Sequence, residues 1–223
     1  MAKFKARKSR GVRHTPICRS DFEMQRNAEI GLFMELSAVG TFGLQTLVFA
    51  LVSASFTVIY LVQPVLPVIR QEFGVDEKQA SYTVSAVIVG IALANLPFGR
   101  LADRFPVKPL IAVGGIVLTL FGLLCAFTHQ MALLIVFRFV KGLFIPAMTT
   151  CLVAYLARSL PVERFNVVMG SYVAATVAGG LGGRLLGGWI HPPLDWRWAF
   201  VTASLLIAAA TLAALLWLPA RGA

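Results

Sequence analysis

After its first forty residues, the chain alternates long apolar runs with short polar segments. Six of these runs share a length of about 20 residues or more and hold few charged side chains, and they span 42–68, 80–98, 109–128, 131–157, 165–190 and 198–218. A helix of about 20 residues crosses the hydrocarbon core of a bilayer, and only a helix or a closed barrel satisfies its own backbone there. The pattern predicts an all-α membrane protein with six transmembrane helices.

The predicted organisation has three parts. A basic tail covers residues 1–40, a six-helix bundle covers 41–219, and a short C-terminal segment covers 220–223. The segments between the runs are short, so each helix is expected to run antiparallel to the next. Composition agrees, because 58% of residues are hydrophobic and 13% are charged, about half the charged share of a soluble domain.

The basic residues fall mainly on one side of this arrangement. Eight Lys or Arg residues precede the first run, three lie between the second and third, two lie between the fourth and fifth, and one follows the last. The segments on the other side hold only three. Lys and Arg favour the cytoplasmic side, so both termini are expected in the cytoplasm. The net charge of +10 then follows largely from topology, and the expected partner is a lipid bilayer rather than a nucleic acid.

The segment between the second and third runs carries the most specific motif. It reads Gly99-Arg-Leu-Ala-Asp-Arg-Phe-Pro-Val-Lys-Pro109, and we interpret it as a charged turn at the membrane surface. It resembles the loop between helices two and three of the major facilitator superfamily of transporters, Gly-x-Leu-Ala-Asp-Arg-x-Gly-Arg-Lys/Arg. The family's Gly-Arg pair is replaced by Pro-Val here, and the matching residues are Gly99, Leu101, Ala102, Asp103, Arg104 and Lys108.

This resemblance implies the N-terminal half of the major facilitator fold, as in exporters of the bacterial inner membrane. Transporters of this family usually have twelve helices in two halves that alternate access to the substrate. A second six-helix half, or a second copy of the chain, is therefore an expected partner. In the family the loop aspartate, here Asp103, packs against the opposite half and helps to latch the outward-open state.

Two cations lie within the fourth predicted helix. Arg138, Lys141 and Gly142 project within about 60° of one another, and an ionisable side chain at this depth costs about 2.5–3.5 kcal/mol unless it faces protein or water. The pair implies a water-filled cavity or an acidic partner, yet the first five helices hold no buried acid. The stretch resembles the family pattern Arg-x-x-Gln-Gly, which implies that Arg138 couples proton movement or substrate binding to conformational change. The alternative is that Arg138 snorkels or binds backbone carbonyls.

The fifth predicted helix carries a stripe of small residues at every fourth position. This stripe, which predicts close approach of another helix, consists of Ala175, Gly179, Gly183 and Gly187. The run resembles the glycine-rich fifth-helix motif of superfamily antiporters but lacks its Gly-Pro pair. Arg184 lies among the glycines, near enough to the helix end to reach the surface, and we group it with Arg138 and Lys141 as an intramembrane charge.

Other polar residues lie beside prolines or begin a helix. Tyr60 and Gln63 precede Pro64 in a kinked part of the first predicted helix, and Asn95 precedes Pro97 in the second. Tyr60, Gln63 and Asn95 are candidates to line a cavity, or else hydrogen-bonded core residues. The run Trp196-Arg-Trp-Ala-Phe200 is typical of the start of the sixth helix in such exporters, and its tryptophans are expected at the interface.

The pattern does not favour an enzyme or a metal protein. The three cysteines, Cys18, Cys125 and Cys151, lack metal-ligand spacing and are expected to pack as small side chains. A Gly-x-Ser-x-Gly run is absent, and no cofactor is expected.

We therefore expect secondary active transport, proton-linked export of a small solute, with Arg138 and Lys141 holding or gating an anionic or polar substrate. The alternative is a truncated or regulatory six-helix membrane protein without transport.

Overall fold

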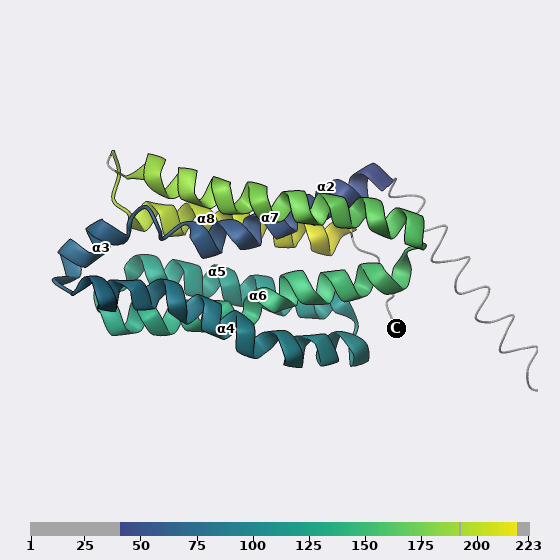
Figure 1. Ribbon diagram of the computed structural model, residues 1–223, viewed down its shortest axis with the longest axis horizontal. Helices are drawn as coiled ribbons and strands as arrows, with labels where there is room; N and C mark the ends of the chain where they lie inside the picture. The colour runs from purple at the N-terminus through teal and green to yellow at the C-terminus, as the bar shows by residue number, and fades with distance from the viewer. Residues whose placement is uncertain (1–40, 192, 218–223) are drawn as a thin grey trace, which may run out of the picture. The chain divides into compact units, whose positions relative to one another are not determined.

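The computed structural model describes residues 41–191 and 193–217, which form helices and no strand (Figure 1). The helices are α2 (Thr41–Tyr60), α3 (Leu66–Phe73), α4 (Glu77–Arg104), α5 (Val107–Phe127), α6 (Met131–Ser159), α7 (Val162–Ile190) and α8 (Arg197–Trp217). All but α3 are long and apolar enough to cross a membrane. The prediction of an all-α protein with six spans is confirmed. The proposed basic tail and the C-terminal segment lie outside the described residues.

The first apolar run is not one continuous helix, which corrects the expected span 42–68. Pro64 has no N–H to donate to the carbonyl of Tyr60, so the helix cannot continue through it. Instead the Gln63 N–H donates to the Tyr60 carbonyl (3.1 Å), which is a tighter bond than an α-helix makes. The chain turns through residues 61–65, and α3 begins at Leu66. Ile59, Leu61 and Val62 are buried, so α2 ends inside the protein, and its last carbonyls have no N–H partner within the helix.

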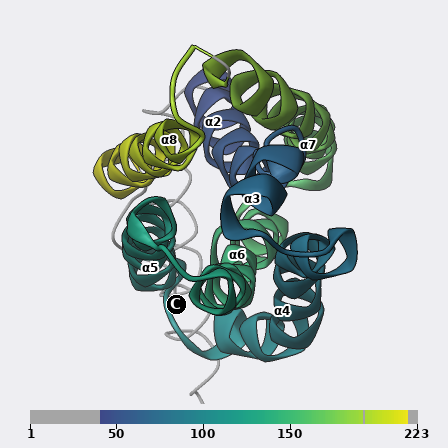
Figure 2. The ribbon, with the colours of Figure 1, turned by 90° about the vertical axis from the view of Figure 1, so that its left-hand side faces the viewer.

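The helices form two groups, one of α2, α7 and α8 and one of α4, α5 and α6. α2 packs against α7 and α8, α6 packs against α4 and α5, and α5 packs against α8. In the end view, α2 and α6 lie between the α5/α8 side and the α4/α7 side (Figure 2). We call the end that carries α3 the α3 end of the bundle.

The motif at 99–109 is helical over most of its length, which corrects its interpretation as a turn. α4 continues through Gly99 to Arg104 and ends at Phe105, which is extended (φ −122°, ψ 150°). Pro106 disfavours the α conformation for the residue before it, and α5 begins directly after it at Val107. The motif thus forms the last six residues of α4 and the first three of α5, joined by Phe105 and Pro106.

Candidate functional site

Arg138 lies inside the bundle, between helices, and contacts two helices besides its own. It is fully buried, 7 residues into α6 from Met131, which is about 10 Å along the helix axis. Its Nε donates to the carbonyl of Thr83 in α4 (2.7 Å), and one Nη donates to the carbonyl of Ile59 in α2 (3.0 Å). The Ile59 carbonyl is available because α2 ends one residue later. Of the two sequence interpretations, the structure shows binding to backbone carbonyls; the coupling role stays a prediction.

Lys141 lies beside Arg138 and is only 1% exposed. Its Nζ is 5.5 Å from the centre of the Phe200 ring, and the Arg138 guanidinium is 5.9 Å from the same ring. Aromatic faces attract cations, more strongly when both are desolvated. Among the described residues neither cation has an acidic partner, and neither reaches the surface of the bundle. The two cations are therefore covered by the surrounding helices.

Arg184, Tyr60 and Gln63 form a second polar group, which we call the Arg184 cluster. The Nε of Arg184 donates to Oε1 of Gln63 (2.8 Å), and the guanidinium lies 5.0 Å from the centre of the Tyr60 ring. Arg184 is exposed, and Tyr60 and Gln63 are half-buried. Arg184 lies 6 residues before the end of α7 at Ile190, about 9 Å along the axis. The cluster is thus nearly as deep as Arg138 but open.

Asn95, the remaining cavity candidate, lies apart from this cluster. It is exposed on α4, and its side-chain oxygen accepts a hydrogen bond from Thr150 of α6 (2.8 Å). Asn95 is 9 residues from the end of α4 at Arg104, so it lies toward the end opposite α3. The structure does not bring Asn95 together with Tyr60 and Gln63.

The small residues bring α7 onto α2 and α6 onto α4. An added Cβ would meet the backbone of Ser53 at Gly179, of Thr57 at Gly183, and of Leu61 at Gly187. The hydroxyls of Ser53 and Thr57 donate to the carbonyls of Ala175 and Gly179, both at 3.2 Å.

The crossing of α6 with α4 depends on Gly142 and Gly90. An added Cβ on Gly142 would overlap the Val87 carbonyl, and one on Gly90 would lie 2.6 Å from the Phe139 oxygen. This close approach places the Thr83 carbonyl within reach of Arg138.

In the motif, Asp103 accepts a hydrogen bond from Arg158 at the end of α6. Arg158 also donates to the carbonyl of Ala102 (3.0 Å). Both charged side chains are at least half exposed, and exposed ion pairs contribute about 0–1 kcal/mol. In the sequence, Arg158 is one of the two basic residues between the fourth and fifth runs. Its position at the end of α6, on the same side of the bundle as the motif, was the available signal.

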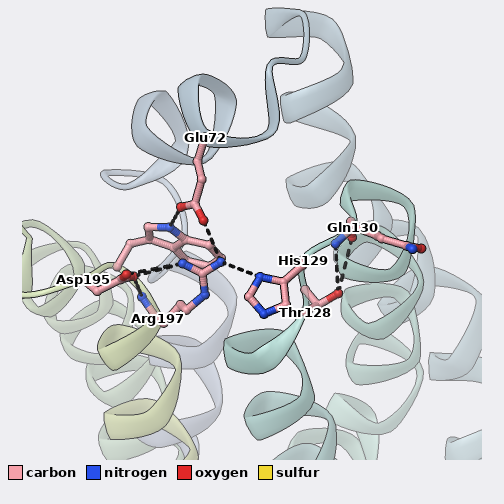
Figure 3. A network of polar contacts seen from close by, with 7 residues as sticks. Glu72, Thr128, His129, Gln130, Asp195 and Arg197 are labelled. Carbon is pink, nitrogen blue, oxygen red and sulfur yellow. Dashed lines mark hydrogen bonds and ion pairs between the residues drawn. The ribbon is translucent and has the colours of Figure 1, made fainter.

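A polar network at the α3 end was not predicted (Figure 3). The carboxylate of Glu72 in α3 accepts from Arg197 (2.6 Å) and from Nε1 of Trp196. Arg197 also lies 3.3 Å from Oδ2 of Asp195 and 3.5 Å from Nδ1 of His129. The network ties α3 to the start of α8. A break in α2 was needed to place Glu72 there, so the sequence held no direct signal.

The same network corrects the expected position of one tryptophan. Trp196 is buried, packed at 6.2 Å from Phe73 and 5.7 Å from Phe200 between ring centres. Trp198 is exposed, as an interfacial residue would be. The indole N–H of Trp196 needs a partner when buried, and Glu72 supplies it.

Glu72 lies in α3, outside the six membrane-spanning helices. Burial alone would raise the pKa of this carboxyl, but the hydrogen bonds from Arg197 and Trp196 outweigh burial and lower its pKa below the ordinary value of 4.5. Glu72 is therefore an anion at neutral pH.

Within the described parts of the chain, no three His, Cys, Asp or Glu side chains are placed to hold a metal ion. Cys125 and Cys151 are buried in helices, and Cys18 lies outside the described residues.

A bundle of six apolar helices that carries cations and other polar side chains at membrane depth defines a multi-pass membrane protein. The sequence model of the Major Facilitator Superfamily matches residues 48–223. The chain belongs to this superfamily, whose members are transporters rather than enzymes.

Similar proteins occur in several bacteria. The uncharacterized MFS-type transporter YybF of Bacillus subtilis is 26% identical over 152 residues, 68% of this chain and 38% of that protein. The inner membrane transport protein YnfM of Escherichia coli is 28% identical over 65% of this chain and 34% of that protein. A multidrug resistance protein B homolog of Mycobacterium tuberculosis is 32% identical over 58% of this chain and 24% of that protein.

The fold resembles that of a solved transporter. A bacterial homolog of the human lysosomal transporter Spinster, inward-facing and unoccupied, superposes with a TM-score of 0.69 at 17% identity, over 82% of this chain and 44% of that chain. At this identity the likeness concerns the fold alone. The chain thus spans between about a quarter and two fifths of the length of the curated relatives described above.

Proposed function

We propose that the chain works in proton-linked export of a small solute, as one six-helix half of a major facilitator transporter. The observation that carries the proposal is the exposed Arg184 cluster at membrane depth. A charged side chain there faces protein or water, because hydrocarbon costs it about 2.5–3.5 kcal/mol. A second half or a second copy opposite this cluster would enclose a water-accessible path between the two bodies.

Arg138 supports the conformational part of this proposal. Alternating access needs elements that rock against one another, and Arg138 binds carbonyls of two other helices at the point where α2 is interrupted. A change in helix packing would alter these two bonds together. This is the physical basis on which Arg138 would couple binding or protonation to movement.

Transport is tested by proton flux in everted membrane vesicles that contain the chain, expressed alone and together with a second copy or a candidate second half. Addition of a substrate from a compound library is expected to dissipate a preformed pH gradient. Asp103→Asn is expected to abolish this flux if the motif latches the chain to a second half, whereas Arg70→Gln, on exposed α3, is expected to leave it unchanged. A pH gradient that no compound dissipates, in any pairing, favours the alternative of a six-helix protein without transport.

The proposal includes an orientation with both termini in the cytoplasm. It is supported by the excess of Lys and Arg on that side. Single cysteines introduced at Arg104 and at Asp195 test it with a membrane-impermeant maleimide on intact cells. The expected result is labelling at position 195 only. Labelling at position 104 only would show the opposite orientation.

A further inference from the structure

We propose that Arg184 is the anion-binding residue of this path, so that the transported solute carries a small oxyanion such as a carboxylate or a phosphate. The inference rests on the proposed transport function and adds the substrate class and the residue. It also moves the substrate contact away from Arg138 and Lys141, which are buried.

The first step concerns which cation a solute can reach. Three cations lie inside the predicted spans, and of these Arg138 and Lys141 are no more than 1% exposed. Arg138 already uses its Nε and one Nη on backbone carbonyls. Arg184 is exposed at nearly the same depth. Only Arg184 of these three can meet a solute without helix rearrangement.

The second step concerns the donors that Arg184 has left. Its Nε is occupied by Gln63, which holds the plane of the guanidinium over the Tyr60 ring. Neither Nη atom has a hydrogen bond to a described residue, so one edge of the fork is open. A guanidinium edge matches a planar oxyanion with two parallel hydrogen bonds. The Gln63 amide nitrogen is also without a partner among the described residues and adds a donor beside it.

The third step concerns space around the guanidinium. α7 carries Gly180 and Gly188 one turn before and one turn after Arg184. Residues at this spacing lie on the same helix face. An added Cβ would lie 3.4 Å from the Tyr60 ring at Gly180 and 3.6 Å from Pro64 at Gly188, so the glycines leave room for Tyr60 and Pro64 beside the cation. The bundle therefore presents a positioned cation, an aromatic face and an amide, with no described acid bound to Arg184.

The test measures anion binding to the purified full chain in maltoside micelles free of lipid. The probes are radiolabelled benzoate, acetate and inorganic phosphate. At least one probe is expected to bind saturably, and Arg184→Gln is expected to weaken that binding by about tenfold or more, since hydrogen bonds to charged groups contribute about 1.5–3 kcal/mol. Arg70→Gln removes a similar charge elsewhere and is expected to bind as the wild type does.

A second variant keeps Arg184 in place. Gln63→Glu puts a carboxylate of the same shape against the guanidinium, so it is expected to compete with the probe and weaken binding by a similar factor at neutral pH. Circular dichroism checks that each variant remains helical. No saturable binding of any probe, or equal binding by wild type, R184Q and Q63E, overturns the proposal.

Two further measurements separate the sources of the anion and the two proposals. Short-chain phosphatidylglycerol that displaces the probes and binds more tightly, in an Arg184-dependent way, would show a lipid headgroup site and overturn a solute site. Arg184-dependent probe binding without any proton flux would contradict the transport proposal and support the anion site. Flux that R184Q leaves unchanged would overturn the anion site while transport stands.

Discussion

At the scale of single residues, the buried guanidinium of Arg138 has an unusual set of partners. It binds two carbonyls in two helices and lies near an aromatic ring. Its other Nη is buried without a hydrogen bond among the described residues. A buried charge is tolerated only where its partners compensate for lost water. The planar fork of arginine is what allows one side chain to reach both carbonyls.

Arg138→Lys should therefore destabilise the bundle although it keeps the charge. A single ammonium on a flexible stem cannot replace both Nε and Nη, and loss of one hydrogen bond to a charged group costs about 1.5–3 kcal/mol. The measurement is the free energy of unfolding from a dodecyl sulfate titration followed by circular dichroism. Arg70→Lys, on a half-exposed side chain, serves as the control and should change little. Equal unfolding of the R138K variant and the wild type would contradict the structural role.

Glu72 predicts a pH dependence of stability. Its pKa is lower in the folded protein than in the unfolded chain, so its contribution is fully present above the unfolded value of 4.5 and is lost as the pH falls through the folded pKa. Thermal unfolding at neutral pH should show Glu72→Gln less stable than the wild type, and the difference should shrink as the pH falls below 4.5. Glu77→Gln, at a carboxylate that is 86% exposed, is the control and should change the stability little. A Glu72→Gln deficit that is constant with pH would exclude an ionic contribution.

At the scale of helices, the two main pairings depend on absent side chains rather than on large ones. α6 meets α4 at Gly142, and α7 meets α2 at the stripe of Gly179, Gly183 and Gly187. Apolar side chains gain little from leaving lipid for protein, so close backbone packing has to supply the association. The helices that make these contacts also carry Arg138 and Arg184, so the packing sets where both cations lie.

Gly142→Ala tests this arrangement at the α4–α6 crossing. The new Cβ would overlap the Val87 carbonyl, a backbone atom that cannot turn aside, and overpacking of this kind costs about 1–3 kcal/mol. The helices would separate and lengthen the bond from Arg138 to Thr83. Gly170→Ala is the matched control, because nothing lies within 4 Å of its added Cβ. The same unfolding titration should show a loss for G142A and none for G170A; two equal values would mean that the crossing is not tightly packed.

At the scale of the whole molecule, the charged and polar side chains divide into a covered pair and an open cluster. Arg138 and Lys141 lie inside the bundle, while Arg184 is exposed at a similar depth. The matched relatives are two and a half to four times as long as the matched segments. Under the proposed function, the open cluster faces a second body, which would contribute the other part of any substrate site. The chain then supplies one wall of a path.

The sequence by itself determined the six spans, the α fold and the family, because hydrophobic length and the order of residues 99–109 are local properties. It also indicated the packing glycines of α7, because they recur at every fourth position. It did not show that the motif continues α4, because the end of an apolar run does not mark the end of a helix: α4 continues past the run to Arg104. Only the tertiary structure decided which cation is covered and which is open. That choice depends on where α2 ends, since the break at Pro64 releases the Ile59 carbonyl for Arg138 and brings Gln63 to Arg184.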